Sequence, residues 1–171
     1  LLNRELLVEA REKYEKCLSI DEDYKWAFYN LARSYDQEDP LKAIAYYQTA
    51  TEKDEEYMDA FFRWGNELFI LDRFEEAREK YERCLELDPD YKWAFLNLGI
   101  SYQSQNPQKA IGYYHNIIDR DAADHDAFNG VYYCITLLDE TKDQIEEFHS
   151  LVQKLNSPAG FFALGTLQQL Y

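Results

Sequence analysis

The chain has 171 residues, of which 46% are hydrophobic and 30% are charged, and this balance is typical of a folded globular protein. Its 33 acidic residues outnumber the 18 basic ones, and the net charge of −15 repels the phosphates of nucleic acids and of anionic membranes. We therefore expect no nucleic acid and no membrane partner, and the sequence has no run of about 20 apolar residues that could span a bilayer.

Glycine and proline are rare, with 6 and 4 residues, which favours long helices joined by short connections. Asp39-Pro40 and Asn106-Pro107 each combine an N-cap residue with a proline suited to the first helical turn. The expected fold class is therefore all-α. In chain order, the pattern predicts helices near residues 3–19, 24–36, 40–53, 57–71, 74–87, 91–104, 107–120, 124–138, 141–155 and 159–171.

A long internal repeat dominates the sequence. Residues 10–31 read AREKYEKCLSIDEDYKWAFYNL and residues 77–98 read AREKYERCLELDPDYKWAFLNL, so 17 of these 22 positions match at an offset of 67. A shorter period lies within this one, because an Ala-x-x-x-Tyr pair recurs every 33 or 34 residues. Its alanines are Ala10, Ala43, Ala77 and Ala110. Such a period is typical of stacked helical repeats.

A second recurring pattern precedes the pairs at Ala43, Ala77 and Ala110. It consists of a large residue, an apolar residue three positions later and a small residue directly after that. Its instances are Phe28-x-x-Leu31-Ala32, Phe61-x-x-Trp64-Gly65 and Phe95-x-x-Leu98-Gly99. Over essentially the whole chain, this pattern resembles the tetratricopeptide repeat family. The resemblance implies an α-solenoid, a right-handed superhelix of stacked antiparallel helix pairs. Small residues would let paired helices approach, and large ones would fill the space between layers.

We expect a single solenoid over residues 1–171, with about four repeats and partial helices at both ends. Tyr132 and Gln144 replace small residues, so the pair at 124–155 is expected to be distorted; an unrelated helical hairpin is the alternative. Both ends resemble interrupted repeats, which suggests a segment of a longer protein. The last helix has little polar surface and is expected to continue into such a repeat or to pack on a partner. Its apolar residues are Phe161, Phe162, Leu164, Leu167, Leu170 and Tyr171.

In the family that the sequence resembles, the first helix of each pair lines a concave groove. The positions expected to face this groove are those that packing between helices leaves free. They are Trp26, Tyr29, Asn30, Arg33, Asp59, Phe62, Arg63, Asn66, Trp93, Leu96, Asn97, Ile100, Asp126, Asn129 and Tyr133.

Asn30 and Asn97 hold the place where some superhelical members of the family carry an asparagine ladder that grips a peptide backbone. An amide both donates and accepts hydrogen bonds, so it suits an extended chain of any sequence. The alternative is that the two asparagines bond neighbouring helices. Arg63 and Arg33 would hold a carboxylate of the ligand, or else pair with a groove acid such as Asp59.

Trp26 and Trp93 begin equivalent first helices, where they would either anchor a ligand or cover the preceding turn. Chaperone-binding family members use lysines to clamp two carboxylates. We reject that specificity, because the lysine positions are occupied here by Tyr29, Asp59, Phe62, Trp93 and Leu96.

Signatures of catalysis and of metal binding are missing from the sequence. His115, His125 and His149 have no metal-ligand spacing, and neither a nucleophile motif nor a glycine-rich phosphate loop is present. The odd count of three cysteines predicts free thiols, which fits a reducing, cytoplasmic location. We therefore expect no enzyme, no cofactor and no metal.

The function that the sequence predicts is a protein-interaction scaffold whose groove binds a peptide segment or helix of another protein. The acidic charge favours a basic partner. Two alternatives remain open. One is self-assembly into a homo-oligomer through the open ends, and the other is a regulatory module of a larger enzyme.

Overall fold

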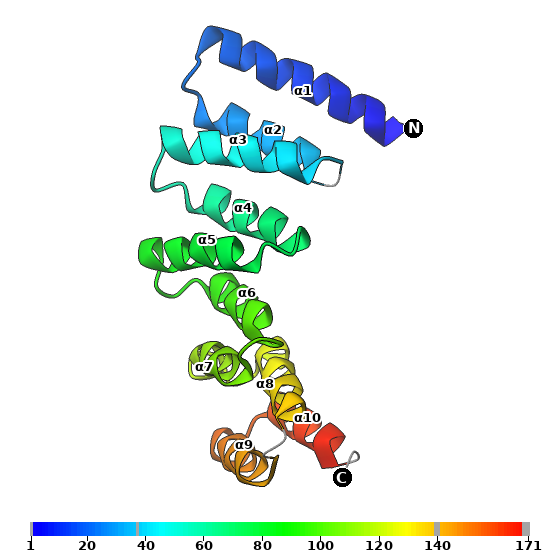
Figure 1. The fold of residues 1–171 in the computed structure, drawn as a ribbon, viewed down its shortest axis with the longest axis vertical. Helices are drawn as coiled ribbons and strands as arrows, with labels where there is room; N and C mark the ends of the chain where they lie inside the picture. Colours follow the sequence, from blue (N-terminus) through cyan, green and yellow to red (C-terminus); the bar gives the residue numbers. More distant parts are fainter. Residues whose placement is uncertain (1, 37, 139–140, 169–171) are drawn as a thin grey trace. The chain divides into compact units, whose positions relative to one another are not determined.

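The computed structural model describes residues 2–36, 38–138 and 141–168, and Figure 1 shows this part of the chain as helices joined by short connections. All ten predicted helices are confirmed within it, with ends that differ by three residues at most. Residues 169–171 of the predicted last helix lie outside the described residues. The helices are α1 (Leu2–Ile20), α2 (Lys25–Tyr35), α3 (Pro40–Lys53), α4 (Met58–Ile70), α5 (Phe74–Leu87), α6 (Lys92–Tyr102), α7 (Pro107–Ile118), α8 (His125–Leu137), α9 (Thr141–Leu155) and α10 (Pro158–Gln168).

The chain divides into two compact units, residues 1–89 with α1–α5 and residues 90–171 with α6–α10. In the first unit, consecutive helices pack on one another in sequence order from α1 to α5 (Figure 1). In the second unit, α6, α7 and α8 follow the same order. Each unit is therefore a stack of helix pairs, the arrangement of an α-solenoid.

The predicted N-caps at the two prolines are confirmed. Oδ1 of Asp39 accepts a hydrogen bond from the backbone N–H of Lys42 at 3.1 Å, and Oδ1 of Asn106 accepts one from Lys109 at 3.0 Å. Each bond satisfies a backbone donor that the first turn of a helix leaves without a partner. These caps explain why α3 and α7 begin at the same place in their repeats.

Small residues let the helices of a pair approach closely. Ala32 and Ala43 are fully buried beside Tyr47 in the first unit. In the same unit, the ring of Tyr81 lies against Gly65. This close packing of small against large residues agrees with the role that the repeat pattern assigns to them.

The pair formed by α8 and α9 departs from this regularity, as the sequence predicts. α9 makes far less contact with α8 than α5 makes with α4, and α10 packs more closely on α8 than α9 does. The predicted lack of a small residue in α8 is only partly right, because Gly130 supplies one two positions before Tyr132. A Cβ atom at Gly130 would lie 2.4 Å from Cζ of Tyr114. The side chain of Gln144 lies outside the described residues.

α10 presents both buried and exposed apolar residues. Leu164 is buried in the core of the second unit, together with Ala159 and Ala163. Phe161 and Phe162 are exposed. The side chains of Leu167, Leu170 and Tyr171 lie outside the described residues.

Candidate partner-binding surface

In the first unit, α2 and α4 carry the predicted groove residues. Trp26 stands at the start of α2 with 46% of its surface exposed, and its ring meets that of Tyr57 edge-on at a centroid distance of 5.1 Å. Tyr29 lies one turn further along α2 and is half-buried between Tyr57 and Tyr47, at 5.1 and 5.8 Å. Trp26 therefore keeps about half of its surface available while its ring is held in place.

A cavity of about 560 Å³ opens between α1, α2 and α4. Two predicted groove residues line it, Arg33 from α2 and Arg63 from α4. The other lining residues are Arg4, Leu7, Ser34, Asp36 and Glu38. The guanidinium of Arg33 also lies 5.8 Å from the ring centroid of Tyr29. This recess is polar and contains charges of both signs.

Arg63 belongs to an internal polar network. It interacts with the hydroxyl of Tyr29 and with the charge of Asp36. Asp36 accepts a hydrogen bond from the hydroxyl of Tyr47 at 2.7 Å. Burial raises the pKa of Asp36, while the Tyr47 hydrogen bond and the charges of Arg63 and Arg33 act in the opposite direction. The acid beside Arg63 is thus Asp36, where the sequence suggested Asp59 or another groove acid.

Glu67 of α4 lies close to this network and is only 3% exposed. Among the described residues, its Oε2 has no hydrogen-bond partner. Burial and the charge of Asp36 raise the pKa of Glu67, the charge of Arg63 lowers it, and the net result is a pKa of about 7. A carboxyl group that binds its proton near neutral pH therefore lies beneath the surface of α4.

Two of the predicted asparagines bond within the first unit. The Nδ2 of Asn30 donates to the backbone carbonyl of Trp26 at 2.7 Å, and the Oδ1 of Asn66 accepts from the Tyr81 hydroxyl at 2.9 Å. Each bond therefore uses one hydrogen-bonding group of the amide within the first unit: the amide nitrogen of Asn30 and the amide oxygen of Asn66. Phe62 lies next to Asn66 on α4, half-buried against the ring of Tyr81 at 5.9 Å.

In the second unit, predicted groove positions from two first helices come together. A recess of about 260 Å³ lies between α6 and α8. Leu96 and Ile100 line it from α6, and Asp126 and Asn129 line it from α8. Gln103, Tyr114 and Gly130 complete the lining. The recess is thus built largely from positions that the repeat pattern selected.

Exposed aromatic residues flank this recess on both helices. Trp93, the counterpart of Trp26, is 48% exposed at the start of α6, and Tyr133 is equally exposed on α8. Asn97 is half-buried on α6. The ammonium of Lys92 lies 5.2 Å from the ring centroid of Trp93 and also pairs with Asp124.

Asp36 and Glu67 are the residues that sequence reasoning missed. Both stand at ends of first helices, where the family pattern specifies no residue type, so the pattern carried no signal for them. A weak signal exists for Glu67, because it is an acid between the apolar residues of a helix that is otherwise mostly apolar on that side.

Among the residues that the structure describes, no group of three or more His, Cys, Asp and Glu side chains is placed to hold a metal ion. Within the same residues, no helix is both long and apolar enough to cross a membrane. Cys84 and Cys134 are buried, and Cys17 is partly exposed; all three are free.

Comparisons with known proteins agree with a helical repeat fold. A TPR repeat family matches residues 65–106, and a tetratricopeptide repeat family matches residues 93–122. The chain is 32% identical over 108 residues to a UDP-N-acetylglucosamine–peptide N-acetylglucosaminyltransferase of Giardia intestinalis. The match covers 63% of this chain and 7% of that protein, so the chain spans a small part of its relative.

Solved structures resemble this chain over most of its length. The crystal structure of MamA protein has a TM-score of 0.77 and 21% identity, and the match covers 89% of this chain and 84% of that one. YrrB, described as a TPR protein with an unusual peptide-binding site, has a TM-score of 0.75 and 20% identity over 98% of this chain and 87% of that one. At these identities, the likeness concerns the fold.

Proposed function

Because the chain is a tetratricopeptide repeat protein, a helical scaffold of the kind that binds other proteins, we propose that it holds an extended segment or a helix of a partner on the exposed faces of its first helices. The recess between α6 and α8 is the observation that carries this proposal. It joins Leu96 and Ile100 to Asp126 and Asn129 beside the half-exposed Trp93.

The chemistry of this recess suits a peptide. Leu96, Ile100 and Trp93 offer apolar and aromatic surface, which usually supplies the energetic centre of an interface. The amide of Asn129 can pair with a peptide N–H or C=O, and Asp126 adds a negative charge. Together with the net charge of −15, this favours a partner segment that combines an apolar residue with a basic one.

In the first unit, the surface around Trp26, Tyr29 and Arg33 is the second contact area that we propose. Arg63 acts there mainly by positioning Tyr29, since its charge is already shared with Asp36. We therefore assign ligand contact to Trp26 and Arg33, which are more exposed than Arg63.

Peptide display on the purified chain, followed by calorimetric titration of the selected peptides, tests the proposal. Trp93→Ala and Ile100→Ser should weaken binding about tenfold or more, because each removes apolar contact area. Leu41→Ser is the control, since Leu41 is also an exposed apolar residue, at 63%, but lies on the second helix α3. If Leu41→Ser weakens binding and the α6 variants do not, the partner binds the faces of the second helices.

Self-assembly is a second candidate that one specific observation favours. α10 exposes Phe161 and Phe162, the latter to 69%, and α1 exposes Leu6 and Val8. Exposed apolar clusters of this kind commonly mark protein contacts. Sedimentation at increasing concentration tests it: a mass that rises in the native chain, but not in Phe162→Ser, supports self-association, and a constant monomer mass excludes it.

A regulatory role inside a larger enzyme is the third candidate, supported by the similarity to part of the Giardia glycosyltransferase. The full-length protein that contains this sequence would then transfer a sugar to a peptide. Assaying that protein for transfer from UDP-N-acetylglucosamine tests the idea, and a full-length protein without such activity contradicts it.

A further inference from the structure

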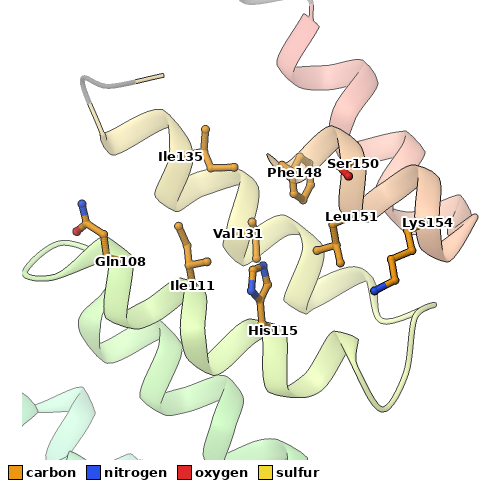
Figure 2. Close-up of a pocket in the computed structure, with 9 residues that line it drawn as sticks. All are labelled: Gln108, Ile111, His115, Val131, Ile135, Phe148, Ser150, Leu151 and Lys154. Atoms are coloured by element: carbon orange, nitrogen blue, oxygen red, sulfur yellow. The ribbon is translucent and has the colours of Figure 1, made fainter. Parts of the chain in front are cut away.

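The second unit contains a cavity of about 490 Å³ on the side of α8 that α7 and α9 flank. Figure 2 shows it between these three helices, with side chains from all of them directed toward it. This cavity is separate from the recess between α6 and α8, and only second helices and the inner side of α8 form it.

The cavity has an identifiable cause in the repeat. At the offset of 67 residues, Val131 is the counterpart of Trp64, whose large indole stacks on Phe61 in the first unit at 6.4 Å. The smaller side chain on α8 leaves space between the helices, in agreement with the sparse contact between α8 and α9.

The floor and walls of the cavity are apolar. Val131 and Ile135 of α8 and Phe148 of α9 are buried at its floor. Ile111 of α7 and Leu151 of α9 are partly buried and form its walls. A space of a few hundred Å³ with such a lining is in the range that small-molecule sites occupy.

Polar groups lie around the opening, and one of them, Lys154, carries a positive charge. Lys154 extends from α9 toward the side on which His115 of α7 lies, while Gln108 stands at the other end (Figure 2). Within the described residues, Lys154 has no ion pair. Among the described residues, the ammonium of Lys154 thus has no counter-ion at the edge of this apolar cavity, although the chain has a net charge of −15.

We propose that this cavity binds a small amphiphile with a carboxylate head and an unbranched alkyl chain, such as a medium-chain fatty acid. The alkyl chain lies over Ile111, Val131 and Ile135, where it displaces water from apolar surface. The carboxylate lies at the opposite end, paired with the ammonium of Lys154 and within reach of the His115 imidazole, which can donate a hydrogen bond. The proposal does not depend on the partner-binding faces.

Calorimetric titration of the chain with decanoate, below its micelle concentration, tests the proposal. We expect saturable binding at a ratio of one to one, weaker binding of octanoate, and much weaker binding of decanol and of decyltrimethylammonium, which lack the negative charge. No saturable binding of decanoate at millimolar concentration overturns the proposal. Equal binding of decanoate and decyltrimethylammonium overturns the role of Lys154.

Two variants locate the site. Lys154→Glu reverses the charge at the opening without touching the core, and we expect it to lower the affinity for decanoate about tenfold or more. Lys16→Glu, at a lysine of α1 that is also exposed, is the control and should have no effect. Val131→Trp fills the cavity with the side chain that Trp64 supplies in the first unit, and it should abolish binding while the helix content stays unchanged. Decanoate binding that survives both Lys154→Glu and Val131→Trp contradicts this site.

Discussion

The ring of Tyr81 lies so close to Gly65 that a Cβ atom added to the glycine would be 2.6 Å from Cε1 of the tyrosine. No real Cβ contact is that short, and the tyrosine ring is held in the core at 1% exposure. The pair therefore sets the distance between α4 and α5. Gly99 and Tyr114 repeat the relationship in the second unit, at 2.5 Å.

Gly65→Ala should destabilise the chain, because the methyl group has to displace the ring of Tyr81. Overpacking of this kind costs about 1–3 kcal/mol, which exceeds the roughly 1 kcal/mol that alanine gains over glycine within a helix. Gly112→Ala is the matched control: it lies in α7 with open space around it, and it should raise the stability. Urea unfolding of both variants measures the difference, and a stabilised Gly65→Ala variant would contradict the packing.

Glu67 should make the stability of the chain depend on pH. Its pKa is raised from an ordinary value of 4.5 to about 7, so the folded state binds this proton more tightly than the unfolded state. The stabilisation is full below pH 4.5 and is lost as the pH rises through 7. At about 1.4 kcal/mol for each pKa unit, the loss between pH 4.5 and 8 is on the order of 3 kcal/mol at most.

Glu67→Gln removes this titration and should flatten the stability curve between pH 5 and pH 8. The free energy of unfolding in urea at several pH values is the measurement. Glu12→Gln removes an exposed acid from α1 and serves as the control, with a slope close to that of the native chain. A slope that Glu67→Gln leaves unchanged would place the titration elsewhere.

Asp124 caps the start of α8 and also forms an ion pair. Its Oδ1 accepts the backbone N–H of Ala127 at 2.8 Å, and its buried side chain pairs with the ammonium of Lys92. Asp124→Ala should lower the free energy of unfolding by about 2 kcal/mol, since it removes both the cap and the ion pair. Asp124→Ser keeps a capping oxygen and should lose less. Equal losses in the two variants would show that the cap contributes little.

The three thiols should differ in reactivity. Burial raises the pKa of Cys84 and of Cys134 to about 12, so their reactive thiolate forms are scarce at pH 8. Cys17 is partly exposed on α1. Iodoacetamide at pH 8 should therefore modify Cys17 first, as followed by mass spectrometry of peptides, with Cys84 and Cys134 reacting only after denaturation. Similar rates for all three in the folded chain would contradict this burial.

Much of the fold could be predicted from the sequence, because the repeat pattern reflects contacts between residues that are close together in the chain. Tyr35 accepts a hydrogen bond from Lys42 at 2.9 Å, and Tyr102 accepts one from Lys109 at 2.7 Å, so a contact recurs at the same offset of 67 residues. Such contacts involve residues only seven apart, and the caps at Asp39 and Asn106 involve neighbours three apart. A repeated sequence therefore predicts them wherever it occurs.

The candidate surface was predicted only in outline. Periodicity identified Leu96, Ile100, Asp126 and Asn129 as positions on one side of their helices, and the recess between α6 and α8 contains all four. It did not indicate that Asn30 bonds to its own helix, since this depends on a side-chain conformation.

By itself, the sequence determined the helices, their pairing and the small and large residues at their contacts, because a period of 33 or 34 residues specifies which side of each helix meets its neighbour. Only the tertiary structure decided that Glu67 is buried beside Asp36 and that a cavity opens over Val131. Both depend on distances among three helices at once. Such distances result from the summed volumes of side chains that are far apart in the sequence, which no local pattern contains.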